Sequence, residues 1–81
     1  MVTKKVYIDS IEKIQSFVHI INNFSGQLDL SSGCSRVNAK SLMGIFSLDI
    51  SQPLDFNIHN DEYADYILKA ISAYLISSNQ G

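Results

Sequence analysis

The sequence has few of the residues that carry metal, disulfide or nucleic-acid chemistry. It holds one cysteine, one proline and two histidines in 81 residues, and its formal net charge is −2. Cys34 alone cannot form a disulfide framework or a cysteine-based metal site, and neither His19 nor His59 has a spaced cysteine or carboxylate partner. The slight acidity gives no basic surface for a nucleic acid. We therefore expect no metal, no cofactor and no nucleic-acid partner.

Long apolar runs are also missing. No run approaches the length that spans a membrane, and the first residues lead into alternation rather than into the apolar centre of a signal peptide. The sequence is nevertheless 46% hydrophobic, which is typical of a compact globular chain. A sequence of this length predicts one domain, which spans residues 1–81. We expect the protein to be cytoplasmic and to have no membrane partner.

The spacing of the apolar residues predicts the order βαββαβα. Strands are expected over residues 2–8, 24–30, 36–39 and 54–59. Helices are expected from Asp9 to Ile21, after Ser41, and after Asn60 or Asp61, while residues 77–81 should fray. Because each long helix is apolar on one side only, the fold class is α+β, with a four-stranded antiparallel sheet covered on one face by three helices.

The apolar sides of the expected helices and strands also predict which residues form the core and which lie on the exposed face of the sheet. Asp9 and Glu12 fit an acidic capping box at the first helix, with Ser10 helping to cap it. The apolar stripe of the last helix is expected to contain Tyr66, Ile67, Ala70, Ile71, Tyr74 and Leu75. The expected core consists of Ile14, Val18, Ile21, Leu28, Ile45, Leu48, Phe56, Ile58, Ile67, Ala70 and Ile71. The uncovered face of the sheet is expected to carry residues such as Thr3, Lys4 and Asp55.

The stretch from Val37 to Leu48 reads as a strand end that runs into a short helix. Ser41 is a favoured N-cap residue and stands directly before an apolar cluster. At helical spacing Ile45 points away from Met43. This leaves two interpretations, a core helix or an exposed patch that binds a partner. The residues of the cluster are Leu42, Met43 and Phe46.

The whole stretch, Val37-Asn38-Ala39-Lys40-Ser41-Leu42-Met43-Gly44-Ile45-Phe46-Ser47-Leu48, resembles the regulatory-serine motif of HPr, the phosphocarrier family of the bacterial sugar phosphotransferase system. The resemblance implies the open-faced β-sandwich of that family. It also implies that HPr kinase/phosphorylase phosphorylates Ser41, and that the phosphorylated form binds the catabolite control repressor or other proteins of the system. The implied partner-binding residues are Lys40, Leu42, Met43 and Phe46.

A second motif of the HPr family is missing from this sequence. The family carries its phosphoryl group on the histidine of a Gly-x-His-Ala-Arg-Pro motif at the start of the first helix. Here the corresponding residues 9–14 read Asp-Ser-Ile-Glu-Lys-Ile, without histidine, arginine or proline. Two carboxylates at that helix end would repel a phosphoryl group. We therefore interpret the chain as a non-catalytic regulatory homologue that uses Ser41.

Two other functions stay open. The chain could be a phosphocarrier with a non-standard acceptor, for which His19 and His59 are the candidates by residue type. Their expected places, on the solvent side of the first helix and on the sheet face away from the core, favour ordinary surface residues. The chain could also be an adaptor that keeps only the fold and binds an unrelated partner through the apolar cluster.

Overall fold

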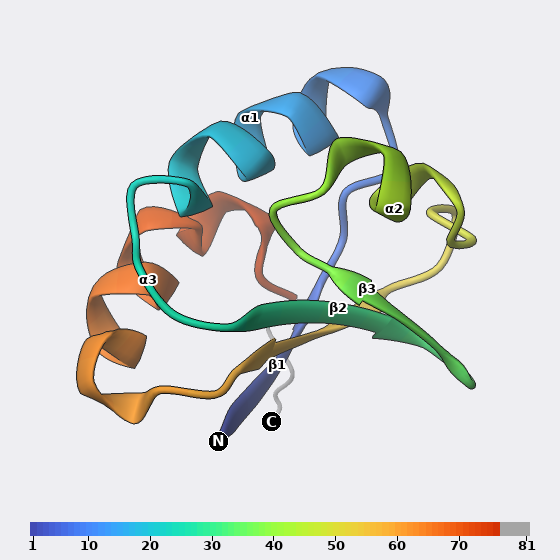
Figure 1. Ribbon diagram of the computed structural model, residues 1–81. Helices are drawn as coiled ribbons and strands as arrows, with labels where there is room; N and C mark the ends of the chain where they lie inside the picture. Colours follow the sequence, from blue (N-terminus) through green and yellow to red (C-terminus); the bar gives the residue numbers. More distant parts are fainter. Residues whose placement is uncertain (77–81) are drawn as a thin grey trace.

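The computed structural model describes residues 1–76, and its elements follow the predicted order. They are β1 (Val2–Val6), α1 (Ile11–Ile21), β2 (Leu28–Ser32), β3 (Ser35–Asn38), α2 (Leu42–Phe46), β4 (Leu54–Ile58) and α3 (Ala64–Ala70), with 3₁₀ turns η1 (Asp61–Tyr63) and η2 (Ser72–Tyr74) on either side of α3. The strands form one antiparallel sheet in the order β1-β4-β2-β3, and the helices cover one of its faces (Figure 1).

This arrangement confirms the predicted α+β fold. Among residues 1–76 no helix is long and apolar enough to cross a membrane. The expected fraying of residues 77–81 lies outside the described residues.

The core lies between the sheet and the helices. Leu54, Phe56 and Ile58 alternate along β4 and are buried, because every second residue of a strand points to the same face. The ring of Phe56 meets the edge of Phe17 from α1, with centroids 5.3 Å apart and planes at 78°. Such edge-to-face pairs are favoured by the aromatic quadrupole. The sheet is therefore fixed to α1 through β4, one of its two inner strands.

Two of the expected core residues lie elsewhere. Val18 is only partly buried, and Ala70 is exposed. α3 buries Ala64 and Ile67, which are three residues apart, and the buried Ile71 follows four residues later, so the fully buried positions form a narrow stripe. The side chains that come directly before Ile67 and Ile71 in the sequence therefore face solvent. The predicted stripe was too broad, and Tyr66, with 67% of its surface exposed, lies outside it.

Ser10, and not Asp9, caps α1. The Ser10 Oγ accepts a hydrogen bond from the Lys13 backbone N–H at 3.2 Å. The Asp9 carboxylate instead accepts one from the Lys13 Nζ at 2.9 Å, so the predicted acidic capping box is wrong. This hydrogen bond lowers the pKa of Asp9 below its ordinary value and raises the pKa of Lys13. The lysine four residues after Asp9 competes successfully for the carboxylate.

The strand bounds also differ from the predicted ones. β2 begins at Leu28, because the chain first turns through residues 22–24 and Gly26 adopts a positive φ of 105°. β1 ends at Val6, but the backbone beyond it stays paired. The Tyr7 N–H donates to the Tyr74 carbonyl at 2.9 Å, and the Ile76 N–H donates to the Lys5 carbonyl at 3.1 Å. The segment after α3 therefore lies along the outer edge of β1.

The uncovered sheet face carries a network of polar side chains. Thr3 Oγ1 donates to Asn57 Oδ1 at 2.8 Å, and Asn57 Nδ2 donates to Ser31 Oγ at 3.3 Å. Lys5 pairs with Asp55 at 2.8 Å. The structure thus confirms Thr3 and Asp55 on this face. Lys4 was placed here wrongly, because it lies opposite the buried Phe56 in the β1–β4 register and so belongs to the rim of the covered face.

The same face holds an acid–histidine pair that the sequence pattern does not reveal. The His59 Nε2 donates to the Asp29 Oδ2 at 2.6 Å. Although Asp29 lies on the uncovered face, only 9% of its side chain is exposed. The expectation that His59 lacks a carboxylate partner is wrong, because the two residues are thirty positions apart in the chain but meet in the fold. The partner comes from the β2–β4 pairing, which brings the ends of these strands together.

We expect His59→Ala to lower the free energy of unfolding by about 1–3 kcal/mol, because it leaves the shielded Asp29 carboxylate without its donor. Urea denaturation followed by circular dichroism measures the change. His19→Ala is the matched control, since His19 is exposed and its side chain makes no hydrogen bond within residues 1–76. That control should stay within about 0.5 kcal/mol of the wild type. Equal losses in both variants would contradict the assigned role of the pair.

Candidate functional site

Ser41 caps α2, as its sequence position predicts. Its backbone is extended, with φ −98° and ψ 108°, and its Oγ accepts a hydrogen bond from the Gly44 N–H at 3.1 Å. The chain arrives from β3 through a tight turn, in which the Ser41 N–H donates to the Asn38 carbonyl at 3.0 Å. The side chain is half-buried. Ser41 therefore stands at a fixed position at the start of the helix, with its hydroxyl oxygen serving as an acceptor.

Gly44 lets α2 lie close to β3. A Cβ at this position would come within 3.1 Å of the Ser41 Oγ and 3.2 Å of the Val37 Cβ. Both distances are tighter than ordinary van der Waals contact, so a larger residue would push the helix away from its cap. The glycine therefore helps to hold Ser41 against the end of the strand.

The apolar cluster of α2 is an exposed patch. Met43 is 78% exposed and Phe46 is 39% exposed, whereas Ile45 is completely buried. Leu42 is partly buried and packs against the core. Ile45 thus anchors the helix, and the opposite side remains open, as the helical spacing predicts. We call Leu42, Met43 and Phe46 the α2 patch. The exposure of Met43 and Phe46 agrees with the exposed patch, whereas Leu42 packs against the core, and the binding of a partner stays a prediction.

Lys40 precedes the cap but reaches away from it. Its Nζ donates to the Phe24 carbonyl in the loop after α1, and the side chain is half-buried. The Lys40 backbone N–H is also bonded, to Asn38 Oδ1 at 2.9 Å. Lys40 therefore ties the segment before α2 to the end of α1. Its implied part in partner binding stays a prediction.

The start of α1 contains no group that could accept or hold a phosphoryl group in the way a histidine–arginine pair would. Its first turn contains Ile11, Glu12 and Lys13. The Lys13 ammonium is paired with Asp9, and its backbone N–H is bonded to Ser10. An incoming anion would therefore meet two carboxylates and a cation that already has a partner. Ile11 itself is 59% exposed and gives this end of the helix an apolar tip.

The structure does not bring the two histidines together. His19 is exposed on α1, which covers one face of the sheet. His59 follows β4 and binds Asp29 on the opposite face. Cys34 is exposed in the turn between β2 and β3. Among the described residues no three histidine, cysteine, aspartate or glutamate side chains gather as a metal site would require.

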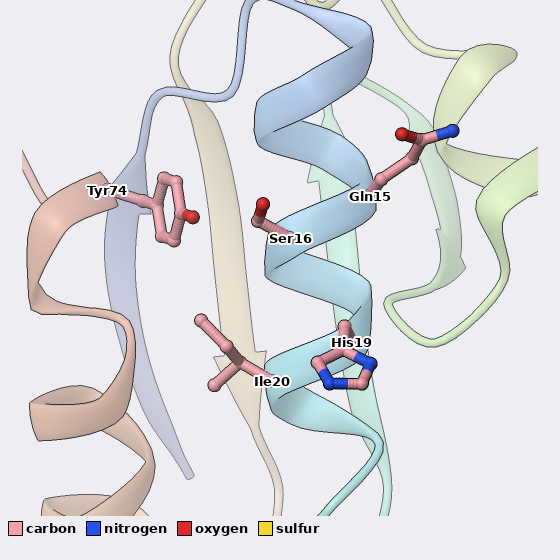
Figure 2. A pocket seen from close by; sticks show the side chains of 5 residues that line it. All are labelled: Gln15, Ser16, His19, Ile20 and Tyr74. Carbon is pink, nitrogen blue, oxygen red and sulfur yellow. The ribbon is translucent and has the colours of Figure 1, made fainter.

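A groove between α1 and η2 was not predicted from the sequence. It has a volume of about 500 Å³ and lies where α1 passes the last turn of the described chain (Figure 2). Helical spacing could have placed the α1 residues on one side, but the opposite wall comes from a distant 3₁₀ turn. The lining residues are Gln15, Ser16, His19, Ile20 and Tyr74.

Comparisons with known proteins agree with the family that residues 37–48 resemble. The family described as "PTS HPr component phosphorylation site" matches residues 12–77. The crystal structure of HPr-C-His from Thermoanaerobacter tengcongensis is similar, with a TM-score of 0.75 and 28% sequence identity over 90% of this chain and 89% of that one. No curated protein sequence matches the chain significantly. The family match begins at Glu12, after the residues that cap α1.

Proposed function

Because the chain belongs to the HPr family of the phosphotransferase system, we propose that it is a regulatory member of that system which acts through Ser41 and the α2 patch rather than through a phosphohistidine. In this proposal HPr kinase/phosphorylase phosphorylates Ser41 in the cytoplasm. The phosphorylated form then binds the catabolite control repressor or another protein of the system. The α2 patch supplies the apolar contact.

One observation carries the proposal: an exposed apolar patch begins directly after a serine that caps the same helix. The exposed Met43 lies two residues after Ser41, and Phe46 lies one helical turn further on. A phosphate on Ser41 would add about −2 charge and three acceptor oxygens, one of which can replace the hydroxyl as the partner of the Gly44 N–H. A partner could thus recognise the phosphate and bury the patch at the same time.

The residues at the N-terminal end of α1 support the proposal that this protein does not carry a phosphoryl group. In this proposal a phosphoryl group at the start of α1 would meet the carboxylates of Asp9 and Glu12, and the nearby Lys13 is paired with Asp9. A phosphoryl group on the Nε2 of His59 would displace the hydrogen bond to Asp29 and would face the Asp29 carboxylate. The second candidate, an adaptor without phosphorylation, requires only the exposed Met43 and Phe46.

We expect no transfer of phosphate to this protein from phosphoenolpyruvate through the first enzyme of the phosphotransferase system. The assay measures the intact mass at neutral pH and again after mild acid, which removes phosphohistidine. A phosphocarrier that contains the Gly-x-His-Ala-Arg-Pro motif is the positive control. An acid-labile phosphate on this chain would overturn the proposal, and His19→Ala and His59→Ala would then identify the acceptor.

A further inference from the structure

The pair of Asp29 and His59 stands where β4 leaves the sheet. The His59 backbone N–H donates to the Gln27 carbonyl at 3.2 Å, so the chain stays bonded to the segment that leads into β2 for one residue beyond β4. The following residues turn into η1 and α3. The hydrogen bond of 2.6 Å between the His59 Nε2 and the Asp29 Oδ2 therefore ties the end of β4 to β2 just before this turn.

The pair is shielded from water, although it lies on the uncovered face of the sheet. Only 9% of the Asp29 side chain and 29% of the His59 side chain are exposed. Asn57, which lies opposite Asp29 in the β2–β4 register, is buried and carries no charge. The attraction between two opposite charges grows as water is excluded from around them. A proton added to the His59 ring would thus meet a carboxylate at hydrogen-bond distance in partly dry surroundings.

Charged side chains on the other strands of this face do not compete for the pair. Lys5 of β1 and Asp55 of β4 bind each other at 2.8 Å, so their charges largely cancel. Arg36 lies on β3, and β2 separates that outer strand from β4. The charges that these strands contribute therefore have little influence on the protonation of His59.

Charges of both signs also occur where the chain enters β1 and leaves β4. The amino terminus at Met1 lies at the same end of the sheet as His59, because β1 begins opposite the end of β4. Two acidic residues, Asp61 and Glu62, follow His59 in the sequence. Among the described side chains, the Asp29 carboxylate is the charged group that bonds to the His59 ring. This contact therefore decides how the ring responds to protons.

We propose that Asp29 and His59 form a clasp between β2 and the end of β4 that acid strengthens. In the neutral ring the Nε2–H donates to the carboxylate. When the Nδ1 atom also takes up a proton, the same contact becomes an ion pair, and hydrogen bonds between two charged groups are the stronger ones. In the unfolded chain the two residues are thirty positions apart and this attraction is lost. The inference does not rest on the function proposed for Ser41.

The direction of the pH dependence follows from proton linkage. The folded protein holds the His59 proton through an attraction that the unfolded chain lacks, so it binds more protons than the unfolded chain between about pH 6 and 7. Aspartate carboxylates stay ionised in this range. The free energy of unfolding should therefore rise as the pH falls from about 7.5 to about 5.5.

A double-mutant cycle at two pH values tests the clasp. Asp29→Asn, His59→Gln, the variant with both changes and the wild type are unfolded in urea at about pH 5.5 and at about pH 7.5, and circular dichroism gives each unfolding equilibrium constant. The coupling between the two positions, expressed as a factor in that constant, should be about fivefold larger at the lower pH. Other titrating groups cancel, because all four proteins contain them.

Two further measurements complete the test. His19→Ala is the matched control, since it removes the exposed histidine of α1, and it should keep the wild-type pH dependence of stability. In the wild type alone, hydrogen exchange of the His59 amide, which is bonded to Gln27, should show a protection factor about fivefold higher at the lower pH. This second measurement does not require any variant to fold.

Three results would overturn the proposal. They are a coupling that is equal at the two pH values or larger at the higher one, an unchanged protection factor of the His59 amide, and a pH dependence that disappears in His19→Ala. Ser41→Ala should keep the wild-type pH dependence. Failure of the clasp can therefore be distinguished from failure of the regulatory function at Ser41.

Discussion

Ser41→Ala should abolish the incorporation of phosphate from ATP by HPr kinase/phosphorylase. The wild type should gain one acid-stable phosphate, and the variant none, because the acceptor oxygen is gone. Loss of the cap to Gly44 should cost only about 1 kcal/mol of stability, so that the variant remains folded. Intact mass spectrometry before and after treatment with acid measures the incorporation, and thermal unfolding measures the stability.

Ser47→Ala is the matched control for this experiment. Ser47 is an exposed serine at the other end of α2, where its Oγ donates to the Gly44 carbonyl at 2.6 Å. The Ser47→Ala variant should be phosphorylated on Ser41 at the wild-type rate. Phosphate that persists in Ser41→Ala, or that disappears in Ser47→Ala, would contradict the assignment of Ser41. A wild-type protein that takes up no phosphate would leave the adaptor function as the explanation of the patch.

Phe46→Ala and Ile45→Ala should separate partner binding from stability. Phe46 is 39% exposed, so its truncation should weaken binding of the phosphorylated protein to the partner by about 1–3 kcal/mol, with a smaller loss of stability. Ile45 is completely buried, and its truncation should lower the free energy of unfolding by about 2–5 kcal/mol. Titration calorimetry with the catabolite control repressor and chemical denaturation of each variant give the two quantities.

Met43→Ala provides the control for exposure. With 78% of Met43 in solvent, its truncation should change stability by no more than about 0.5 kcal/mol, while still weakening the partner complex. If Phe46→Ala destabilises the protein as much as Ile45→Ala and leaves the affinity unchanged, the ring belongs to the core and the patch is not a docking surface.

The sequence predicted the region around α2 well because its determinants are local. Ser41 caps a helix that starts at the next residue, and helical spacing alone separates Ile45 from Met43. The alternation of β4 is equally local, and it predicted this inner strand of the sheet. The motif from Val37 to Leu48 then added the family, which the comparison over residues 12–77 confirms.

The features that the sequence did not predict depend on contacts between distant segments. Asp29 and His59 meet only because β2 pairs with β4, and Tyr74 reaches α1 only after α3 has turned. The cap of α1 is a different case, since Lys13 takes the Asp9 carboxylate that the pattern had assigned to the backbone. Competition between two hydrogen-bond donors for one acceptor is not visible in a spacing rule.

The order of strands has a consequence for how the chain folds as it leaves the ribosome. β1 and β2 do not pair with each other, because β4 lies between them and pairs with both. During synthesis β1 and α1 therefore emerge long before β4, and the sheet can close only once residues 54–58 are free of the exit tunnel. Until then the nascent chain holds a helix whose apolar side is not yet covered, together with unpaired strand edges, and exposed apolar surface of this kind recruits chaperones. Closure of the sheet thus waits for β4 and does not proceed strand by strand from β1.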